Sequence, residues 1–352
     1  MSDIFNFSNT MINWYHKHGR KKLPWQINKN IYKTWISEIM LQQTQVKTVI
    51  PYFKKFIKKF PNFKTLSKSS LDEILFIWSG LGFYNRAKNI YKTAQIIKRK
   101  YKNKIPKEFN TLIKFPGIGK STAGALLSLT YNYYFPILDG NIKRVLRNFY
   151  NLKIKKTKLE KKIWKKLNLL IPIHNAQKFN QSMMDLGKKI CKPKNPLCNI
   201  CPLKKKCLFF INKKSITKKK DIKKKKKTIK KCWFLLKTYK NFYFLKKQKY
   251  NIWKNLYYFP IYFKKIKLKK KLKKEKITKK NKKIKPFLHQ FNKYSLLIKT
   301  IIIKVKKKKY LKKKNGIWCN FFKMKEIGTP SPIKKIIKKY IKIIKKNNKK
   351  IK

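Results

Sequence analysis

The stretch LIKFPGIGKSTA, from Leu112 to Ala123, decides how the first part of this chain folds. Its apolar start is typical of the end of a helix, and the Pro-Gly-Ile-Gly at 116–119 then interrupts the helical pattern. Two glycines allow a sharp turn and a close approach of the backbone to a ligand. A second helix opens directly afterwards, and the N–H groups at its start can point at a phosphate. The stretch therefore predicts a helical hairpin that contacts phosphate, with an ordinary tight turn as the alternative.

The hairpin lies within a region, residues 1–212, that is helical by its apolar spacing. Helical spacing recurs at residues 32–50, 71–78, 87–98, 121–129 and 141–150. Prolines and glycines separate these segments. Residues 213–231 are mostly lysine, with Ile, Thr and one Asp, so we expect a solvated linker there.

Beyond the linker the pattern changes to short segments rich in aromatic and β-branched residues. Strands are predicted at residues 232–236, 242–245, 294–305 and 317–322, and a closing helix at 332–344. The predicted fold class is therefore α+β, with an all-α domain over residues 1–212 and a smaller α+β domain over residues 232–352.

The charge of the chain is extreme. It has 97 Lys and Arg against 11 Asp and Glu, a formal net charge of +86. Such an excess suits a polyanion such as nucleic acid, because basic side chains displace counterions from phosphates. The alternative is a codon bias towards lysine at tolerant surface positions, so the charge alone supports nucleic-acid binding weakly. The chain has no apolar run of the roughly 18 residues that a membrane span needs and no signal-peptide pattern, so we expect it to be cytoplasmic.

Four of the six cysteines crowd into one short loop, at Cys191, Cys198, Cys201 and Cys207. Disulfides are not expected in a cytoplasmic chain, so the four thiolates suggest a metal centre. Zinc is usually held by two close cysteine pairs, whereas only Cys198 and Cys201 form such a pair here. An iron–sulfur cluster can be bound by four cysteines that are further apart along the loop. The spacing of the cysteines therefore favours such a cluster over zinc and over simple buried thiols. Cys232 and Cys319 lie outside the loop and are expected to be core or surface thiols.

Two carboxylates are informative because acidic residues are so rare in this chain. Glu38 sits in an apolar helix turn, where burial would raise its pKa and suit it to proton donation. Asp139 precedes Gly140 at an expected helix start. Taken singly, an exposed helix position explains Glu38 and an N-cap explains Asp139. Together they fit cleavage of a glycosidic bond, in which one carboxyl protonates the leaving group and the other stabilises a positive sugar-like transition state.

Several longer motifs resemble the MutY-type adenine DNA glycosylases, which belong to the endonuclease III-like superfamily. The resemblance covers residues 10–208 and includes the hairpin and the cysteine loop. Its other motifs are LPWQ at 23–26, SEIMLQQTQV at 37–46, GLGFY at 80–84, LDGNIKRV at 138–145 and FNQSMMDLG at 179–187. The resemblance implies a helix–hairpin–helix (HhH-GPD) glycosylase domain that carries a [4Fe–4S] cluster on the four cysteines.

The same resemblance implies roles for individual residues. Glu38 would be the general acid acting on adenine, and Asp139 would steady the oxocarbenium ion. Base-binding residues would be Gln26, Gln42, Phe83, Ser121, Asn141 and Gln181, and hairpin contacts to the DNA backbone would come from Gly117, Gly119 and Lys120. Of these, Gln26 and Gln181 would lie near the flipped adenine. Gln42 and Phe83 would fill or wedge the DNA base stack as the adenine leaves it. The family usually has Tyr at the Phe83 position, so this chain keeps the ring and loses a hydroxyl.

One position separates this chain from endonuclease III, which has a lysine nucleophile just after the hairpin. The matching residue here is Ser121, and Lys120 is one residue away. A non-lysine at this position argues against catalysis by an amine. We therefore expect a monofunctional glycosylase of base excision repair, with water as the nucleophile.

Residues 232–352 resemble, more distantly, the Nudix-like domain that recognises 8-oxoguanine in this family. NIWKNLYYFP at 251–260 and FLHQFNK at 287–293 carry the resemblance. The family's Phe-x-His-x-Phe-Ser-His loop ends here in Asn292-Lys293, which puts the degree of 8-oxoguanine selectivity in doubt. Phe291 and Asn292 are the expected recognition residues. The domain has no glutamate cluster like that of a true Nudix hydrolase, so no pyrophosphatase activity is expected.

The expected substrate is double-stranded DNA with adenine opposite 8-oxoguanine or guanine, and the expected enzyme is a monomer without a membrane partner. Three alternatives stay open at this point. The chain could be a glycosylase of the same fold with another base specificity, or a catalytically degenerate iron–sulfur DNA-binding protein. It could also be a nucleic-acid chaperone driven by charge, although that would leave the cysteines and carboxylates unexplained.

Overall fold

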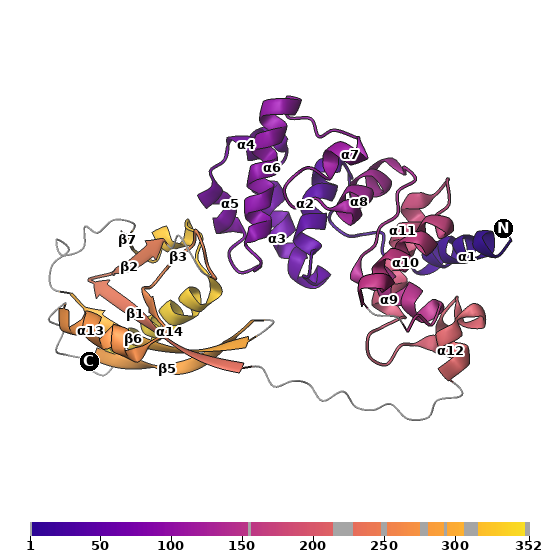
Figure 1. Ribbon diagram of the computed structural model, residues 1–352. Helices are drawn as coiled ribbons and strands as arrows, with labels where there is room; N and C mark the ends of the chain where they lie inside the picture. The colour runs from indigo at the N-terminus through magenta and orange to yellow at the C-terminus, as the bar shows by residue number, and fades with distance from the viewer. Residues whose placement is uncertain are drawn as a thin grey trace. The chain divides into compact units, whose positions relative to one another are not determined.

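The computed structural model describes residues 2–153, 156–213, 228–247, 252–274, 281–291, 294–305 and 316–348. The chain forms two compact units, one made of Met1–Lys68 and Asn89–Asp221 and the other of Ser69–Lys88 and Ile222–Lys352. Figure 1 shows helices along the first part of the chain and strands in the last part. The predicted fold class, a helical domain followed by a smaller α+β domain, is confirmed. Most of the predicted linker, residues 213–231, lies outside the described residues, and a strand already begins at Thr228.

All regular secondary structure among the described residues of the first unit is helical. Its elements are α1 (Ser2–His18), α2 (Ile31–Leu41), α3 (Val46–Lys59), α4 (Phe63–Lys68), most of α6 (Asn85–Tyr101), α7 (Phe109–Leu112), α8 (Lys120–Tyr131), α9 (Gly140–Phe149), α10 (Lys156–Leu170), α11 (Ala176–Lys189), the 3-10 turns η1 (Cys198–Ile200) and η2 (Lys204–Lys206), and α12 (Leu208–Lys213). The helical stretch expected at 32–50 is divided into α2 and α3, because Gln43 adopts a positive φ of 55° in the turn between them.

Two sets of helices build the core of this unit. The helices α1, α9, α10 and α11 bury apolar residues such as Met11, Ile142 and Phe179 against one another. Elsewhere in the unit α2 packs against α3 and α8, and the Trp35 ring stacks on Phe63 with centroids 5.3 Å apart. The hairpin helix α8 contacts both α2 and α11, so it connects the two sets. This arrangement brings together residues that are far apart in the sequence.

The second unit contains α5 (Leu71–Ile77) and a mixed β-sheet. Its other elements are β1 (Thr228–Tyr239), β2 (Phe242–Lys247), β3 (Tyr257–Tyr258), β4 (Ile261–Tyr262), α13 (Lys265–Lys274), β5 (Asn281–Gln290), β6 (Tyr294–Lys304), β7 (Gly316–Cys319), η4 (Lys323–Lys325) and α14 (Ser331–Asn348). The strand order is β3-β2-β1-β6-β5, with β4 paired to β1 and β7 to β2. The central strands β1 and β6 are parallel, with Cys232 opposite Ile298.

The sequence-predicted strands fall on β1, β2, β6 and β7, although β7 is shorter than expected. It ends at Cys319 because a turn begins at Asn320, and the Asn320 side chain accepts a hydrogen bond from the Lys323 N–H. Cys232 and Cys319 are fully buried in the sheet, so both are core thiols. Among the described residues, the structure has no helix that is long and apolar enough to cross a membrane.

Candidate active site

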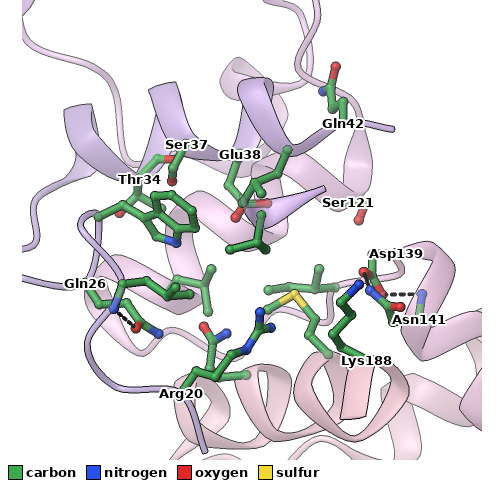
Figure 2. Close-up of a pocket in the computed structure, with 18 of the residues that line it drawn as sticks. Arg20, Gln26, Thr34, Ser37, Glu38, Gln42, Ser121, Asp139, Asn141 and Lys188 are labelled. Atoms are coloured by element: carbon green, nitrogen blue, oxygen red, sulfur yellow. Dashed lines mark hydrogen bonds between the residues drawn. The ribbon is translucent and has the colours of Figure 1, made fainter. Parts of the chain in front are cut away.

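The first unit contains a cavity of about 840 Å³. Its lining comes from α2, from the start of α8, from the start of α9, from α11 and from the segment that connects α1 to α2. The predicted site residues that line it are Gln26, Glu38, Gln42, Ser121, Asp139, Asn141 and Gln181. Figure 2 shows Glu38 of α2 and Asp139 on different sides of this space. The structure therefore brings together residues that the sequence places in five separate motifs.

Glu38 is held on α2 between buried neighbours. The helix begins after Asn30, whose side chain accepts a hydrogen bond from the Lys33 N–H at 2.9 Å. Ser37 and Ile39 on either side of Glu38 are buried, and the Glu38 carboxyl faces the cavity. Burial, and then the negative charge of Asp139, raise the pKa of Glu38 to about 7. This carboxyl is therefore a proton donor at neutral pH.

Asp139 both caps a helix and lines the cavity. One carboxylate oxygen accepts hydrogen bonds from the N–H groups of Asn141 at 2.9 Å and Ile142 at 2.7 Å. The other accepts from the side-chain amide of Asn141 at 2.8 Å. Burial raises the pKa of Asp139, and these hydrogen bonds and the nearby Arg144 oppose that rise. The cap fixes the orientation of a carboxylate at the positive end of α9, so capping is part of how the cavity is built.

The start of α8 places a hydroxyl, and not an amine, on the cavity. The Ser121 hydroxyl accepts a hydrogen bond from the Leu138 N–H at 3.1 Å, which ties α8 to the residue before Asp139. Lys120 is exposed at the first position of α8 and is not part of the cavity lining. Its amino group therefore does not take the place of the lysine nucleophile of endonuclease III.

Two glutamines are fixed by contacts with the backbone. The Gln26 side-chain oxygen accepts a hydrogen bond from the Leu23 N–H at 3.0 Å. The Gln42 amide donates to the carbonyl of Gly117 at 3.3 Å and to the hydroxyl of Thr122 at 3.4 Å, so the end of α2 is joined to the hairpin.

Gly117 itself has a φ of +83°, in the left-handed region that disfavours residues with a Cβ. A Cβ there would also lie 2.9 Å from the Asn89 side chain. The hairpin therefore requires glycine at this position.

Arg144 is a site residue that the sequence did not reveal. Its Nε donates to the Cys191 carbonyl at 2.6 Å, and its Nη2 donates to the Asn141 side-chain oxygen at 2.9 Å and to the Gly187 carbonyl. Since Asn141 in turn donates to Asp139, one guanidinium connects the cysteine loop to the cavity. The sequence did not reveal this role, because the Cys191 and Gly187 carbonyls that accept from Arg144 lie more than 40 residues further along the chain.

The four cysteines of the loop line a second cavity of about 30 Å³, between α9 and α12. Asn148 of α9 borders it and donates a hydrogen bond to the Cys191 sulfur at 3.3 Å. In the part of the chain that the structure describes, no three His, Cys, Asp or Glu side chains are grouped closely enough to hold one metal ion. A cubane cluster divides its four thiolates among separate iron atoms and so accepts a wider spacing. Four thiolates on one loop are the donor set that such a cluster uses.

Comparisons with known proteins identify the family. Residues 36–169 match the family model described as "HhH-GPD superfamily base excision DNA repair protein". The adenine DNA glycosylase of Buchnera aphidicola subsp. Schizaphis graminum (strain Sg) is 50% identical over 343 residues, which cover 95% of this chain and 98% of that protein. This chain belongs to the adenine DNA glycosylase family.

A second relative has the same name, and a solved structure shares the fold of the helical part. The adenine DNA glycosylase of Buchnera aphidicola subsp. Acyrthosiphon pisum (strain APS) is 49% identical over 96% of this chain and 98% of that protein. The solved structure of a thermostable thymine-DNA glycosylase is 25% identical, with a TM-score of 0.56 over 60% of this chain and 98% of that one. The resemblance inferred from the sequence motifs is therefore confirmed.

Two predicted site residues of this adenine DNA glycosylase family member lie in the second unit. The Phe83 ring is 45% exposed, and its backbone has a φ of 47°. The Arg86 guanidinium lies 5.2 Å from the centre of this ring and donates a hydrogen bond to the Gly82 carbonyl at 3.2 Å. Phe291 stacks on Tyr294 with ring centres 5.0 Å apart. Asn292, the other predicted recognition residue, lies outside the described residues, so its role stays a prediction.

Proposed function

We propose that this chain is a monofunctional adenine DNA glycosylase of base excision repair. It hydrolyses the N-glycosidic bond of adenine mispaired with 8-oxoguanine or guanine in double-stranded DNA. The observation that carries this proposal is that Glu38 and Asp139 line one cavity, in which Glu38 has a pKa of about 7. A proton donor and an anion in the same cavity are what a base needs in order to leave its sugar.

The chemistry follows from these two groups. A base inside a duplex is out of reach, so the adenine has to be extruded into the cavity, whose volume of about 840 Å³ is ample for a purine nucleotide. Glu38 donates its proton to a ring nitrogen of adenine. The bond between C1′ and the base then breaks, and its electron pair leaves with the base. The Asp139 carboxylate stabilises the positive charge that develops on the sugar.

Water completes the reaction. It adds to C1′ and gives up a proton to the Glu38 carboxylate, so the products are free adenine and an abasic site, and the acid is restored. Ser121 cannot form a Schiff base, and the amine of Lys120 is not part of the cavity lining. The lysines that do line the cavity, Lys188 among them, lie on the connection between α1 and α2 or on α11 and not at the start of α8, so we expect the enzyme to leave the DNA strand intact.

We further infer that Cys191, Cys198, Cys201 and Cys207 hold a [4Fe–4S] cluster. When bound, the cluster links the thiolates of the loop and so orders it. Arg144 and Asn148 support the loop from α9, through the Cys191 carbonyl and the Cys191 sulfur. Residues 1–212 would be the glycosylase domain, residues 213–231 a linker and residues 232–352 the domain that recognises 8-oxoguanine.

A single-turnover assay tests the function. Duplexes with adenine opposite 8-oxoguanine or opposite guanine are incubated with excess enzyme, and strand cleavage is measured with and without alkali. We expect cleavage only after alkali, because a monofunctional enzyme leaves an abasic site. Breaks that form without alkali and are trapped by borohydride would contradict the monofunctional assignment. Equal rates on the two duplexes would contradict recognition of 8-oxoguanine.

A further inference from the structure

The walls of the catalytic cavity come from segments that are far apart in the sequence. One wall is the connection between α1 and α2, which runs from Arg20 past Gln26. Another is α11, which contributes Gln181 and Met184. These walls are not neighbours along the chain, so noncovalent contacts set the distance between them.

Arg20 and Asp185 form such a contact. The Asp185 side chain has no exposed surface, and the Arg20 side chain is 24% exposed. The Arg20 backbone N–H donates to one carboxylate oxygen at 2.7 Å, and its Nε donates to the other at 2.8 Å. The Arg20 Nη2 also donates to that second oxygen. Charge-assisted hydrogen bonds of this kind are strong and directional, so both the backbone and the side chain of Arg20 are fixed against α11.

Both partners lie close to a glutamine that faces the cavity. On α11, Asp185 follows Gln181 by about one helical turn. On the other wall, the Gln26 N–H donates to the Leu23 carbonyl at 2.8 Å, which closes a turn shortly after Arg20. The Gln26 side-chain oxygen is occupied by the Leu23 N–H. The amide nitrogen of Gln26 is therefore the end that can donate to a base.

We propose that Arg20 and Asp185 are a positioning pair that sets the spacing of Gln26 and Gln181 and thereby the selectivity for adenine. This inference rests on the proposed function, because it concerns the base that enters the same cavity. Asp185 has no exposed surface and does not line the cavity, and the Arg20 guanidinium is directed at Asp185. The pair acts by fixing the distance between the two segments of the cavity wall that carry Gln26 and Gln181.

Stability alone is a weak reason for such a pair. Desolvation of a buried carboxylate and a guanidinium offsets much of their attraction, and apolar residues of similar size often stabilise a protein as well or better. Asp185 is also one of only 11 acidic residues in the chain, and it accepts three hydrogen bonds from one residue of the opposite wall. A positioning role accounts for this geometry.

The test compares excision of two bases. Hypoxanthine inverts the donor and acceptor that adenine presents at ring positions 1 and 6, so the two bases report on hydrogen bonding at that edge. Single-turnover rates are measured on matched duplexes with adenine or hypoxanthine opposite 8-oxoguanine, using the full chain and the variants Asp185→Asn and Arg20→Gln. We expect the ratio of the adenine rate to the hypoxanthine rate to fall by about tenfold or more, because sub-ångström to ångström misplacement costs rate steeply. Affinity for DNA should stay within about twofold, since Asp185 has no exposed surface and Arg20 lines the cavity and makes none of the hairpin's backbone contacts.

Two controls separate positioning from general damage. Glu160→Gln removes the exposed ion pair between Lys143 and Glu160 and should leave the ratio unchanged. Arg20→Lys keeps the charge and the backbone N–H contact and should retain an intermediate ratio, which provides a second variant if Asp185→Asn does not fold.

The outcomes are distinguishable. Equal loss of both rates in the variants, with an unchanged ratio, would overturn the positioning role and leave the proposed function standing. If the unaltered chain excises no adenine at all, the proposed function fails and the inference fails with it.

Discussion

The pKa of Glu38 makes a quantitative prediction about how excision depends on pH. If Glu38 donates the proton, the single-turnover rate follows the fraction of this carboxyl that is protonated. With a pKa of about 7, where an ordinary Glu has 4.5, the rate should fall only about twofold between pH 6 and pH 7 and about fivefold between pH 7 and pH 8. An unshifted carboxyl would lose about tenfold over each of these intervals.

The variant Asp139→Asn tests the cause of the shift. The negative charge of Asp139 is the second contribution to the raised pKa of Glu38, after burial. Its removal should move the midpoint of the pH profile to lower pH, while the absolute rate also falls because the sugar cation loses its stabilising anion. The assay is single-turnover release of adenine from an A:8-oxoguanine duplex between pH 6 and pH 8.5. A rate that falls tenfold per pH unit from pH 6 in the unaltered chain would refute the reasoning. So would a midpoint that stays in place, or moves to higher pH, in Asp139→Asn.

Three further predictions concern the support of the site. Glu38→Gln should stabilise the protein at pH 8 by up to about 3 kcal/mol and much less at pH 5. The reason is that folding raises the pKa of Glu38 from 4.5 to about 7, so the unaltered protein loses stability as the pH rises through this interval. Melting temperatures at the two pH values check this. Arg144→Met should lower the free energy of unfolding by about 2 kcal/mol and reduce the excision rate, since it removes the hydrogen bonds to Asn141 and to the Cys191 carbonyl. Denaturant unfolding at equal cluster content measures the loss of stability, and an unchanged unfolding midpoint contradicts the prediction. Cys198→Ser should lower the iron content below four atoms per chain and the melting temperature with it, whereas Cys319→Ser, in the buried sheet, should leave the iron content unchanged.

Local chemistry made a large part of the fold predictable. The hairpin follows from glycine and proline, and its Gly117 has the positive φ that such a turn requires. The two units follow from a change of apolar spacing on either side of a lysine-rich segment. The break between α2 and α3 was not predicted, because Gln42 to Gln45 include neither Pro nor Gly, and the positive φ falls on Gln43. The lysine-rich α13 was also missed, since charge conceals its few apolar positions.

The predictable part of the site consists of residues whose immediate neighbours are unusual. Glu38 stands out because a carboxyl lies among buried apolar residues, and Asp139 because it precedes a helix start. Arg20 and Arg144 are two of only five arginines among 97 basic residues, but their immediate neighbours do not show what they bind. Their roles depend on Asp185 and on the Cys191 carbonyl, which are distant in the sequence and come close only when α11 and the cysteine loop pack against the rest of the unit.

The central claim is that Glu38 protonates adenine and that water completes the hydrolysis of the N-glycosidic bond. Release of free adenine is its most direct test. Cluster-loaded protein is incubated in excess with an A:8-oxoguanine duplex, and free adenine is quantified by chromatography. The variant Glu38→Gln is compared with Glu108→Gln, which changes an acidic residue outside the cavity lining. The account predicts stoichiometric adenine release by the unaltered chain and by Glu108→Gln, and a loss of at least about a hundredfold in Glu38→Gln. Undiminished release by Glu38→Gln, or no release by the unaltered chain, would contradict it.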